Sequence, residues 1–145
     1  MKERLRSELH QAMKNKDSLR TGTIRMMMAE LTYKEKEGKP VEEQDVYKVF
    51  FGMLRKREEA IDEFTKAKRD DLAEKEKAEM EIIKEFLPKQ MSEEEIRKEI
   101  RMVIAEVGAK DMKAIGQVMG ILTKKLTGKV SGSILSKIVK EELSK

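Results

Sequence analysis

The residues that could do chemistry lie in the last third of the chain, where lysines gather around two glycines. Residues 110–140 contain seven lysines and a single acidic residue, Asp111, so this segment has a formal charge of +6. Ammonium groups pair with phosphates, and a local excess of them is typical of a surface that binds a polyanion. The alternative is a solvated face that only keeps the protein in solution.

The two glycines lie in the stretch "IGQVMG", inside a segment that otherwise has the spacing of an amphipathic helix. Glycine in a helix interior costs about 1 kcal/mol relative to alanine. At about 100° per residue, Gly116 and Gly120 lie along one edge of an apolar stripe. The stripe comprises Met112, Ile115, Met119, Leu122 and Leu126. A helix edge without side chains allows either a neighbouring helix or the backbone of a ligand to come close. We expect helix packing at Gly116 and ligand approach at Gly120.

The loop that follows, "LTGKVSGS", adds small and basic residues ahead of another predicted helix N-terminus, and helix N-termini favour anions. It lacks the spacing of a phosphate-binding P-loop. Together the helix edge and the loop predict a surface that binds a polyanion through its phosphates or other anionic groups. Its residues are Lys113, Gly116, Gln117, Gly120, Lys124, Lys125, Gly128, Lys129 and Ser131.

Nothing in the sequence predicts catalysis by this chain. It contains no cysteine, which excludes disulfides, thiolate metal sites and a cysteine nucleophile. The single histidine, His10, has charged neighbours and no partners for acid–base or metal chemistry. We therefore predict no catalytic residues, no metal site and no cofactor. A protein-interaction adaptor is the main alternative to polyanion binding, with the charged N-terminal helices as its surface, and an enzyme whose site the motifs do not reveal is a third.

The elements that must position these residues are all helices. Apolar residues recur at helical spacing throughout, as in Leu5, Leu9, Ala12 and Met13, and no strand-like alternation is present. Asp17, Ser92, Asp111 and Ser131 are predicted N-caps, and Gly108 is a predicted C-terminal cap. The fold class predicted is all-α.

A domain boundary is predicted at "FLPKQMSEEEI". Pro88 cannot continue a helix, and Ser92 with Glu95 forms a capping box that starts the next one. We expect an N-terminal helical domain, residues 1–88, and a small three-helix domain, residues 92–145. No apolar run is long enough to span a membrane, and the start "MKERLRSELH" has no signal-peptide pattern, so the predicted location is cytoplasmic.

The segment "KDMKAIGQVMGILTKKLTGKVSGSILSKIVKEEL" resembles the signature of the GatB/YqeY family, and "FLPKQMSEEEI" resembles the family's domain junction. "KRDDLAEKEKAEMEII" is similar to the preceding helix of the family, and the chain length is that of a free-standing YqeY-like protein. The resemblance implies an all-helical fold with an N-terminal helical domain and a C-terminal three-helix domain.

The resemblance also implies that the polyanion-binding surface described above binds RNA, because the similar region of the tRNA-dependent amidotransferase is a tail that helps hold the tRNA. The expected partners are thus tRNA or another structured RNA, with an amidotransferase or an aminoacyl-tRNA synthetase as the adaptor's partner. A carbon–nitrogen ligase label would rest on the resemblance only. The chain departs from the family where Val130 and Ser131 replace a small residue and an aspartate.

Overall fold

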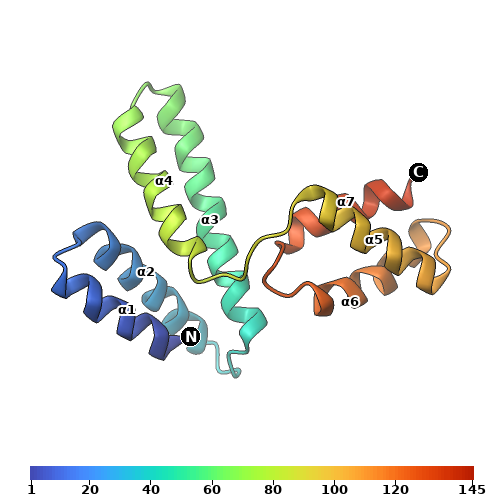
Figure 1. Cartoon of the computed structure of the whole chain (residues 1–145), viewed down its shortest axis with the longest axis horizontal. Helices are drawn as coiled ribbons and strands as arrows, with labels where there is room; N and C mark the ends of the chain where they lie inside the picture. The colour runs from blue at the N-terminus through green and yellow to red at the C-terminus, as the bar shows by residue number, and fades with distance from the viewer. The chain divides into compact units, whose positions relative to one another are not determined.

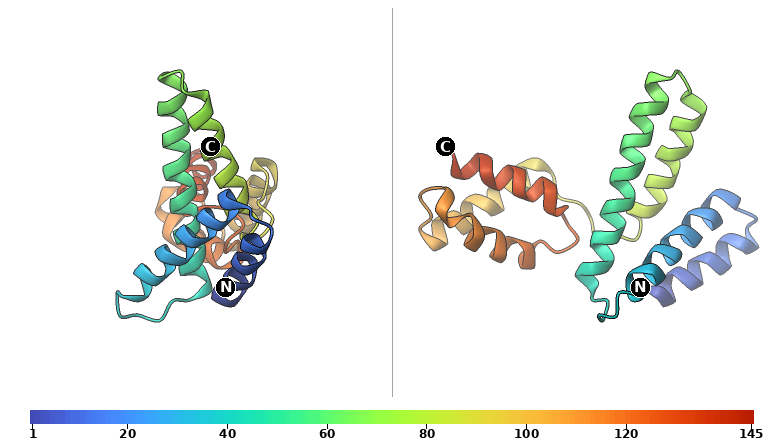
Figure 2. Two further views of the ribbon diagram at one scale, coloured as in Figure 1. Left: turned by 90° about the vertical axis from the view of Figure 1, so that its left-hand side faces the viewer. Right: turned by 180° about the vertical axis from the view of Figure 1, so that it is seen from behind.

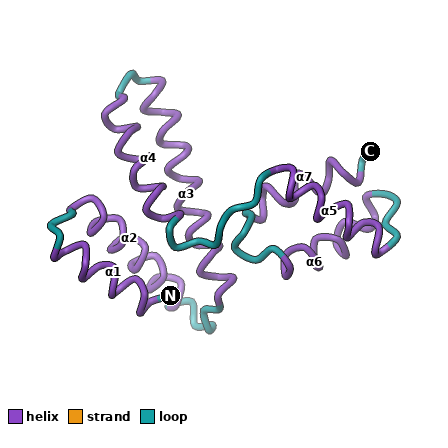
Figure 3. The backbone as a smooth tube through the Cα atoms, in the orientation of Figure 1, coloured by secondary structure: helices purple, strands orange, loops and turns teal.

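The computed structural model describes residues 1–145 and contains only helices and the loops between them (Figures 1 and 3). The all-α prediction is therefore confirmed. The elements in chain order are α1 (Lys2–Lys14), α2 (Ser18–Glu35), α3 (Glu43–Lys66), α4 (Asp70–Lys84), α5 (Glu93–Val107), the 3-10 segment η1 (Met112–Ala114), α6 (Ile115–Lys125) and α7 (Gly132–Leu143). The chain forms two compact units, Met1–Leu87 (unit 1) and Pro88–Lys145 (unit 2).

Unit 1 consists of two antiparallel helix pairs, α1 with α2 and α3 with α4 (Figure 2). Its core is apolar and includes Leu5, Ile24, Phe50 and Ile83, each completely shielded from solvent. Met13 does not join this core as the spacing predicts, and 51% of it is exposed. It lies about 100° around α1 from the buried Ala12, which places it beside the apolar stripe rather than in it.

A buried ion pair, which the sequence analysis did not identify, connects α3 to α4. Arg57 and Glu79 are only 8% and 7% exposed, and Arg57 Nε donates to Glu79 Oε2 at 3.0 Å. The same guanidinium also donates to the carbonyl of Met53 and contacts the sulfur of Met26 on α2. Glu76 Oε2 also lies 3.9 Å from Arg57 Nε. Removing one partner of such a pair leaves a buried charge poorly compensated, so the loss of either Arg57 or Glu79 alone should destabilise unit 1.

Unit 2 is a group of three helices around a small apolar core. Ile100 and Val103 of α5, Val118 and Leu122 of α6 and Val139 of α7 are all fully buried. α6 packs on both α5 and α7, and these two helices also pack on each other. This arrangement fixes which face of α6 is left for solvent.

The helix ends are where the capping residues predict them. Asp17 accepts a hydrogen bond from the amide of Arg20, and Ser92 Oγ accepts one from the amide of Glu95. Gly108 ends α5 in the left-handed conformation, with φ of +68°. These caps satisfy backbone groups that have no partner within the helix.

Candidate nucleic-acid interface

The direction of α6 is set by how it begins. Asp111 Oδ1 accepts a hydrogen bond from the amide of Lys113 at 2.9 Å, and the first turn is the 3-10 segment η1. A 3-10 turn holds three residues rather than 3.6, so Met112 falls out of line with the apolar stripe of α6 and is 41% exposed. Val118, which the predicted stripe left out, is completely buried in its place.

Gly116 and Gly120 lie on the exposed side of α6. A Cβ atom built at either position would meet no heavy atom within 4 Å beyond its own helix surroundings. The expectation that a neighbouring helix packs against Gly116 is therefore wrong. The physical reason is that α5 and α7 contact α6 on the side of Val118 and Leu122, and these two helices complete the core without the glycine edge.

The glycines share their face with polar and basic side chains. At about 100° per residue, Gly116, Gln117, Gly120 and Lys124 fall within an arc of about 100° around α6. All four residues are exposed, and so is Lys113 in the preceding turn. We call Lys113, Gly116, Gln117, Gly120 and Lys124 the α6 face. It offers two ammonium groups and one amide beside a strip of bare backbone.

Lys125 has a partner within unit 2 and does not belong to this face. Its ammonium lies 2.8 Å from Glu99 Oε2 of α5, a buried carboxylate oxygen with no other partner. Pairing with Glu99 raises the pKa of Lys125. The charge of Lys125 is thus largely neutralised, so we leave this residue out of the proposed RNA-binding surface.

The other lysines of the basic segment form no ion pair within the chain. Of the seven lysines in residues 110–140, Lys125 is the only one with a carboxylate within 4.0 Å. The six others are exposed; they are Lys110, Lys113, Lys124, Lys129, Lys137 and Lys140. The basic segment therefore presents six unpaired ammonium groups to solvent.

Acidic side chains of the same unit are held between α5 and α7. Arg97 of α5 contacts Glu93, Glu141 and Glu142 at 2.7, 2.6 and 2.9 Å, and Arg101 contacts Glu142 at 3.3 Å. Burial opposes ionisation of Glu142, but the hydrogen bonds from Arg101 and Arg97 outweigh it and lower the pKa of Glu142 to about 2. Arg97, Arg101 and Lys145, whose ammonium lies 3.2 Å from Glu142, balance the charges of these three carboxylates, so they do not cancel the lysine excess.

The loop between α6 and α7 is fixed by the segment that begins unit 2. Gln90 Nε2 donates to the carbonyls of Pro88 and Gly128, each at 2.8 Å, and the amide of Met91 donates to the carbonyl of Lys129 at 3.1 Å. Gly128 is buried and has φ of +78°, a conformation that favours glycine. The positive φ therefore explains why glycine is required at position 128, and the residue is too deeply buried to contact a ligand.

Lys129 and Ser131 contribute to the loop in different ways. The backbone of Lys129 is hydrogen-bonded to Leu126 and Met91, whereas its side chain is exposed. Ser131 Oγ accepts from the amide of Ile134 at 3.4 Å and caps α7. Ser131 thus performs the capping role predicted for it, and Lys129 adds an ammonium group to the basic surface of unit 2.

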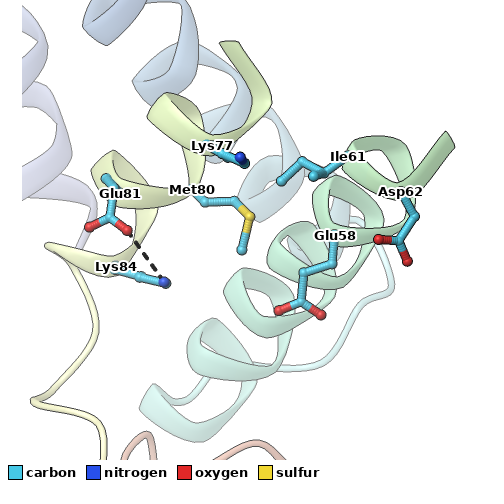
Figure 4. Close-up of a pocket in the computed structure, with 7 residues that line it drawn as sticks. All are labelled: Glu58, Ile61, Asp62, Lys77, Met80, Glu81 and Lys84. Carbon is cyan, nitrogen blue, oxygen red and sulfur yellow. Dashed lines mark hydrogen bonds and ion pairs between the residues drawn. The ribbon is translucent and has the colours of Figure 1, made fainter. Parts of the chain in front are cut away.

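Unit 1 has a separate hollow of about 440 Å³ between α3 and α4 (Figure 4). It is lined by Glu58, Ile61, Asp62, Lys77, Met80, Glu81 and Lys84. Lys84 donates to Glu81 at 3.4 Å across one helical turn. Three acids and two lysines nearly balance each other here, so the hollow has none of the one-sided charge seen on unit 2.

The fold and this surface describe an all-helical protein with a basic C-terminal unit, and sequence comparison supplies the family. The chain matches the family described as "Yqey-like protein" over residues 2–143, so it belongs to the YqeY-like family. The resemblance noted in the sequence is confirmed. None of the helices combines the length and apolar composition that crossing a membrane requires.

The curated relatives carry no name that states an activity. "Uncharacterized protein C22F3.15" of Schizosaccharomyces pombe is 36% identical over 89 residues, which cover 61% of this chain and 72% of the relative. "Altered inheritance of mitochondria protein 41, mitochondrial" is 36% identical in Saccharomyces cerevisiae and 38% in Lachancea thermotolerans, over 85 residues in each. These residues cover 57% of this chain and 46% of the relatives, so the chain spans about half their length.

Proposed function

We propose that this protein is a non-catalytic accessory module that binds tRNA or another structured RNA through unit 2. The observation that carries the proposal is the set of six exposed, unpaired lysines in residues 110–140. Phosphate contacts from such side chains supply most of the affinity and little of the sequence preference of RNA binding. Any chemistry on the RNA would then be done by another protein.

The α6 face and Lys129 form the centre of the proposed contact. A bare strip along α6 lets a sugar–phosphate backbone approach the helix, since no Cβ stands out at Gly116 or Gly120. Lys113 and Lys124 on this face can then reach phosphates, and Gln117 can donate to a phosphate or sugar oxygen. Lys125, Gly128 and Ser131 support the surface through Glu99, Gln90 and the α7 cap.

A salt titration with labelled tRNA tests this proposal. Three phosphate contacts from Lys113, Lys124 and Lys129 predict a slope of log affinity against log salt of about −2 to −3. Replacing all three with Gln should remove most of this slope. The matched control replaces three exposed, unpaired lysines of unit 1, Lys48, Lys56 and Lys75, with Gln.

The outcome depends on which set changes the slope. A flattened slope with the unit 2 set and an unchanged slope with the unit 1 set support the proposal. Equal effects of the two sets would mean that binding follows net charge alone and would contradict the assignment to unit 2. The same titration with single-stranded RNA of equal length shows whether a folded RNA is preferred.

A protein-interaction adaptor, docking on an amidotransferase or an aminoacyl-tRNA synthetase, is the second candidate. Although the charged N-terminal helices were its expected surface, exposed apolar side chains in unit 2 also favour it, where Met102 is 44% and Ile134 is 51% exposed. Apolar docking depends less on salt than phosphate binding does, so the titration distinguishes the two. The cytoplasmic location remains a prediction, to be checked by fractionation of the source cells.

A further inference from the structure

Helix α2 has two apolar faces, one buried in unit 1 and the other only partly covered, where the Arg57 guanidinium contacts the sulfur of Met26. Thr23, Ile24, Met27 and Leu31 are buried in unit 1. A second set of residues recurs at intervals of four, three and four, and we call it the α2 outer stripe: Gly22, Met26, Ala29 and Tyr33. Tyr33 is 72% exposed and Met26 is 40% exposed, although both side chains are large and mostly apolar.

The spacing of the α2 outer stripe is that of a helix-to-helix seam. Intervals of four and three correspond to the a and d positions of a coiled coil, with Met26 and Tyr33 at a and Gly22 and Ala29 at d. The two d residues are small, and a Cβ built at Gly22 meets no heavy atom within 4 Å. Layers of small residues between layers of large ones allow two helix backbones to come close, so a helix is the partner that fits.

The charged residues on the two flanks of the stripe indicate which helix would pack against it. Arg25 directly precedes Met26 and Glu30 directly follows Ala29, so they lie on opposite flanks of the stripe, at g and e. Neither side chain has an ion pair within the chain, and the only hydrogen bond of the Arg25 guanidinium goes to the sulfur of Met13, at 3.9 Å. Both are therefore available to a partner.

The two charges complement each other in a symmetric pair. Residues at g and at the following e are five apart, and in parallel helices a g side chain of one helix meets the e side chain of the other. Arg25 would meet Glu30 of a second copy, and the twofold axis would repeat the contact. An antiparallel pair would instead bring like flanks together and leave Arg25 without a carboxylate.

We propose that the protein forms a parallel dimer in which the α2 outer stripe packs against the same stripe of a second copy. The proposal concerns unit 1 and is independent of the RNA-binding surface on unit 2. A second copy fits better than an unrelated helix because α2 supplies both halves of the charge pair and the apolar seam between them.

Sedimentation velocity of the full chain tests the dimer. The apparent mass should rise from 16.8 kDa towards twice this value between low-micromolar and several-hundred-micromolar protein. Ala29→Glu, at the centre of the stripe, should keep the protein monomeric over this range. Both Ala29 and Ala105 are exposed helical residues, so Ala105→Glu on α5 is the matched control and should leave dimerisation unchanged.

Charge reversal tests the parallel register. Arg25→Glu and Glu30→Arg should each weaken dimerisation by about tenfold, because symmetry turns two attractive pairs into two repulsive ones. The double variant should return to within about threefold of the original affinity. Thermal unfolding of every variant shows that it is folded.

Three outcomes would overturn the proposal. The first is an unaltered protein that stays monomeric throughout, including the case in which the stripe binds a different protein instead. The second is an Ala29→Glu variant that still dimerises. The third is a folded double variant in which the affinity is not restored, because the two charges would then not meet across the interface.

Discussion

Replacing Gly116 and Gly120 with Ala should stabilise unit 2 and weaken RNA binding at the same time. Neither glycine has a positive φ, and neither has a neighbour within 4 Å of the added Cβ, so the methyl groups meet no steric barrier in the free protein. Helix propensity favours Ala by about 1 kcal/mol at Gly120, in mid-helix, and we expect about half of that at Gly116, in the first turn of α6. Together they amount to about 1.5 kcal/mol.

For a unit of this size, about 1.5 kcal/mol corresponds to a rise in melting temperature of about 6–12 °C. Differential scanning calorimetry measures this rise. In a tRNA titration at fixed salt, the methyl groups should keep the RNA backbone from the helix and lower the affinity at least about fivefold, since crowding a close contact costs about 1 kcal/mol or more. Gly52→Ala on α3, where a Cβ also meets nothing within 4 Å, is the matched control: it should leave RNA affinity unchanged.

Two results would refute this reasoning in different ways. A double variant that melts lower than the original protein would mean that the glycine edge is packed after all. A double variant that melts higher and binds RNA with full affinity would mean that the α6 face is not the contact surface. Only a variant that is both more stable and weaker in binding supports the role assigned to the two glycines.

Further predictions concern the contacts that hold each unit together. Glu79→Ala should destabilise unit 1 by about 3 kcal/mol in urea unfolding, because the buried Arg57 loses its nearest carboxylate and keeps only the more distant Glu76, at 3.9 Å. Joint replacement of Arg57 by Met and Glu79 by Leu should cost far less, because no buried charge is then left behind. Equal losses in the two variants would contradict a charge effect. Glu142 has its pKa lowered from 4.5 to about 2, so its ionised form stabilises unit 2 fully above pH 4.5, and this contribution is lost as the pH falls towards 2. The Glu142→Gln variant should therefore have a lower melting temperature at pH 7, and its melting temperature should fall less between pH 5 and pH 2. A melting temperature that falls as much as that of the unaltered protein would argue against the ion cluster with Arg97. Gln90→Ala should speed limited proteolysis at residues 88–92, because the segment loses the hydrogen bond from Gln90 to the carbonyl of Gly128. A cleavage rate equal to that of the unaltered protein would show that the hydrogen bonds of Gln90 do not protect this segment.

The sequence was enough to predict an all-helical fold and five of its helix ends, because these depend on neighbours in the chain. Apolar spacing identified the helical segments, and Asp17, Ser92, Gly108, Asp111 and Ser131 cap the ends where they were expected. A cap acts within three residues of itself, so it does not depend on the rest of the fold. The lysine excess of residues 110–140 was equally visible, since it is a count of residues.

Contacts between helices decided the rest, because they join residues far apart in the chain. The pairing of Lys125 with Glu99 and of Arg57 with Glu79 depends on which helix faces meet, and periodicity within one helix does not specify its neighbour. The sequence signals for the Arg57–Glu79 pair were a basic residue within the apolar stripe of α3 and an acidic residue within that of α4. Gly116 shows the same difference between local and long-range information. Residue spacing predicted that it lies beside the apolar stripe of α6. Its exposure to solvent depends on α5 and α7, which pack against the other side of α6.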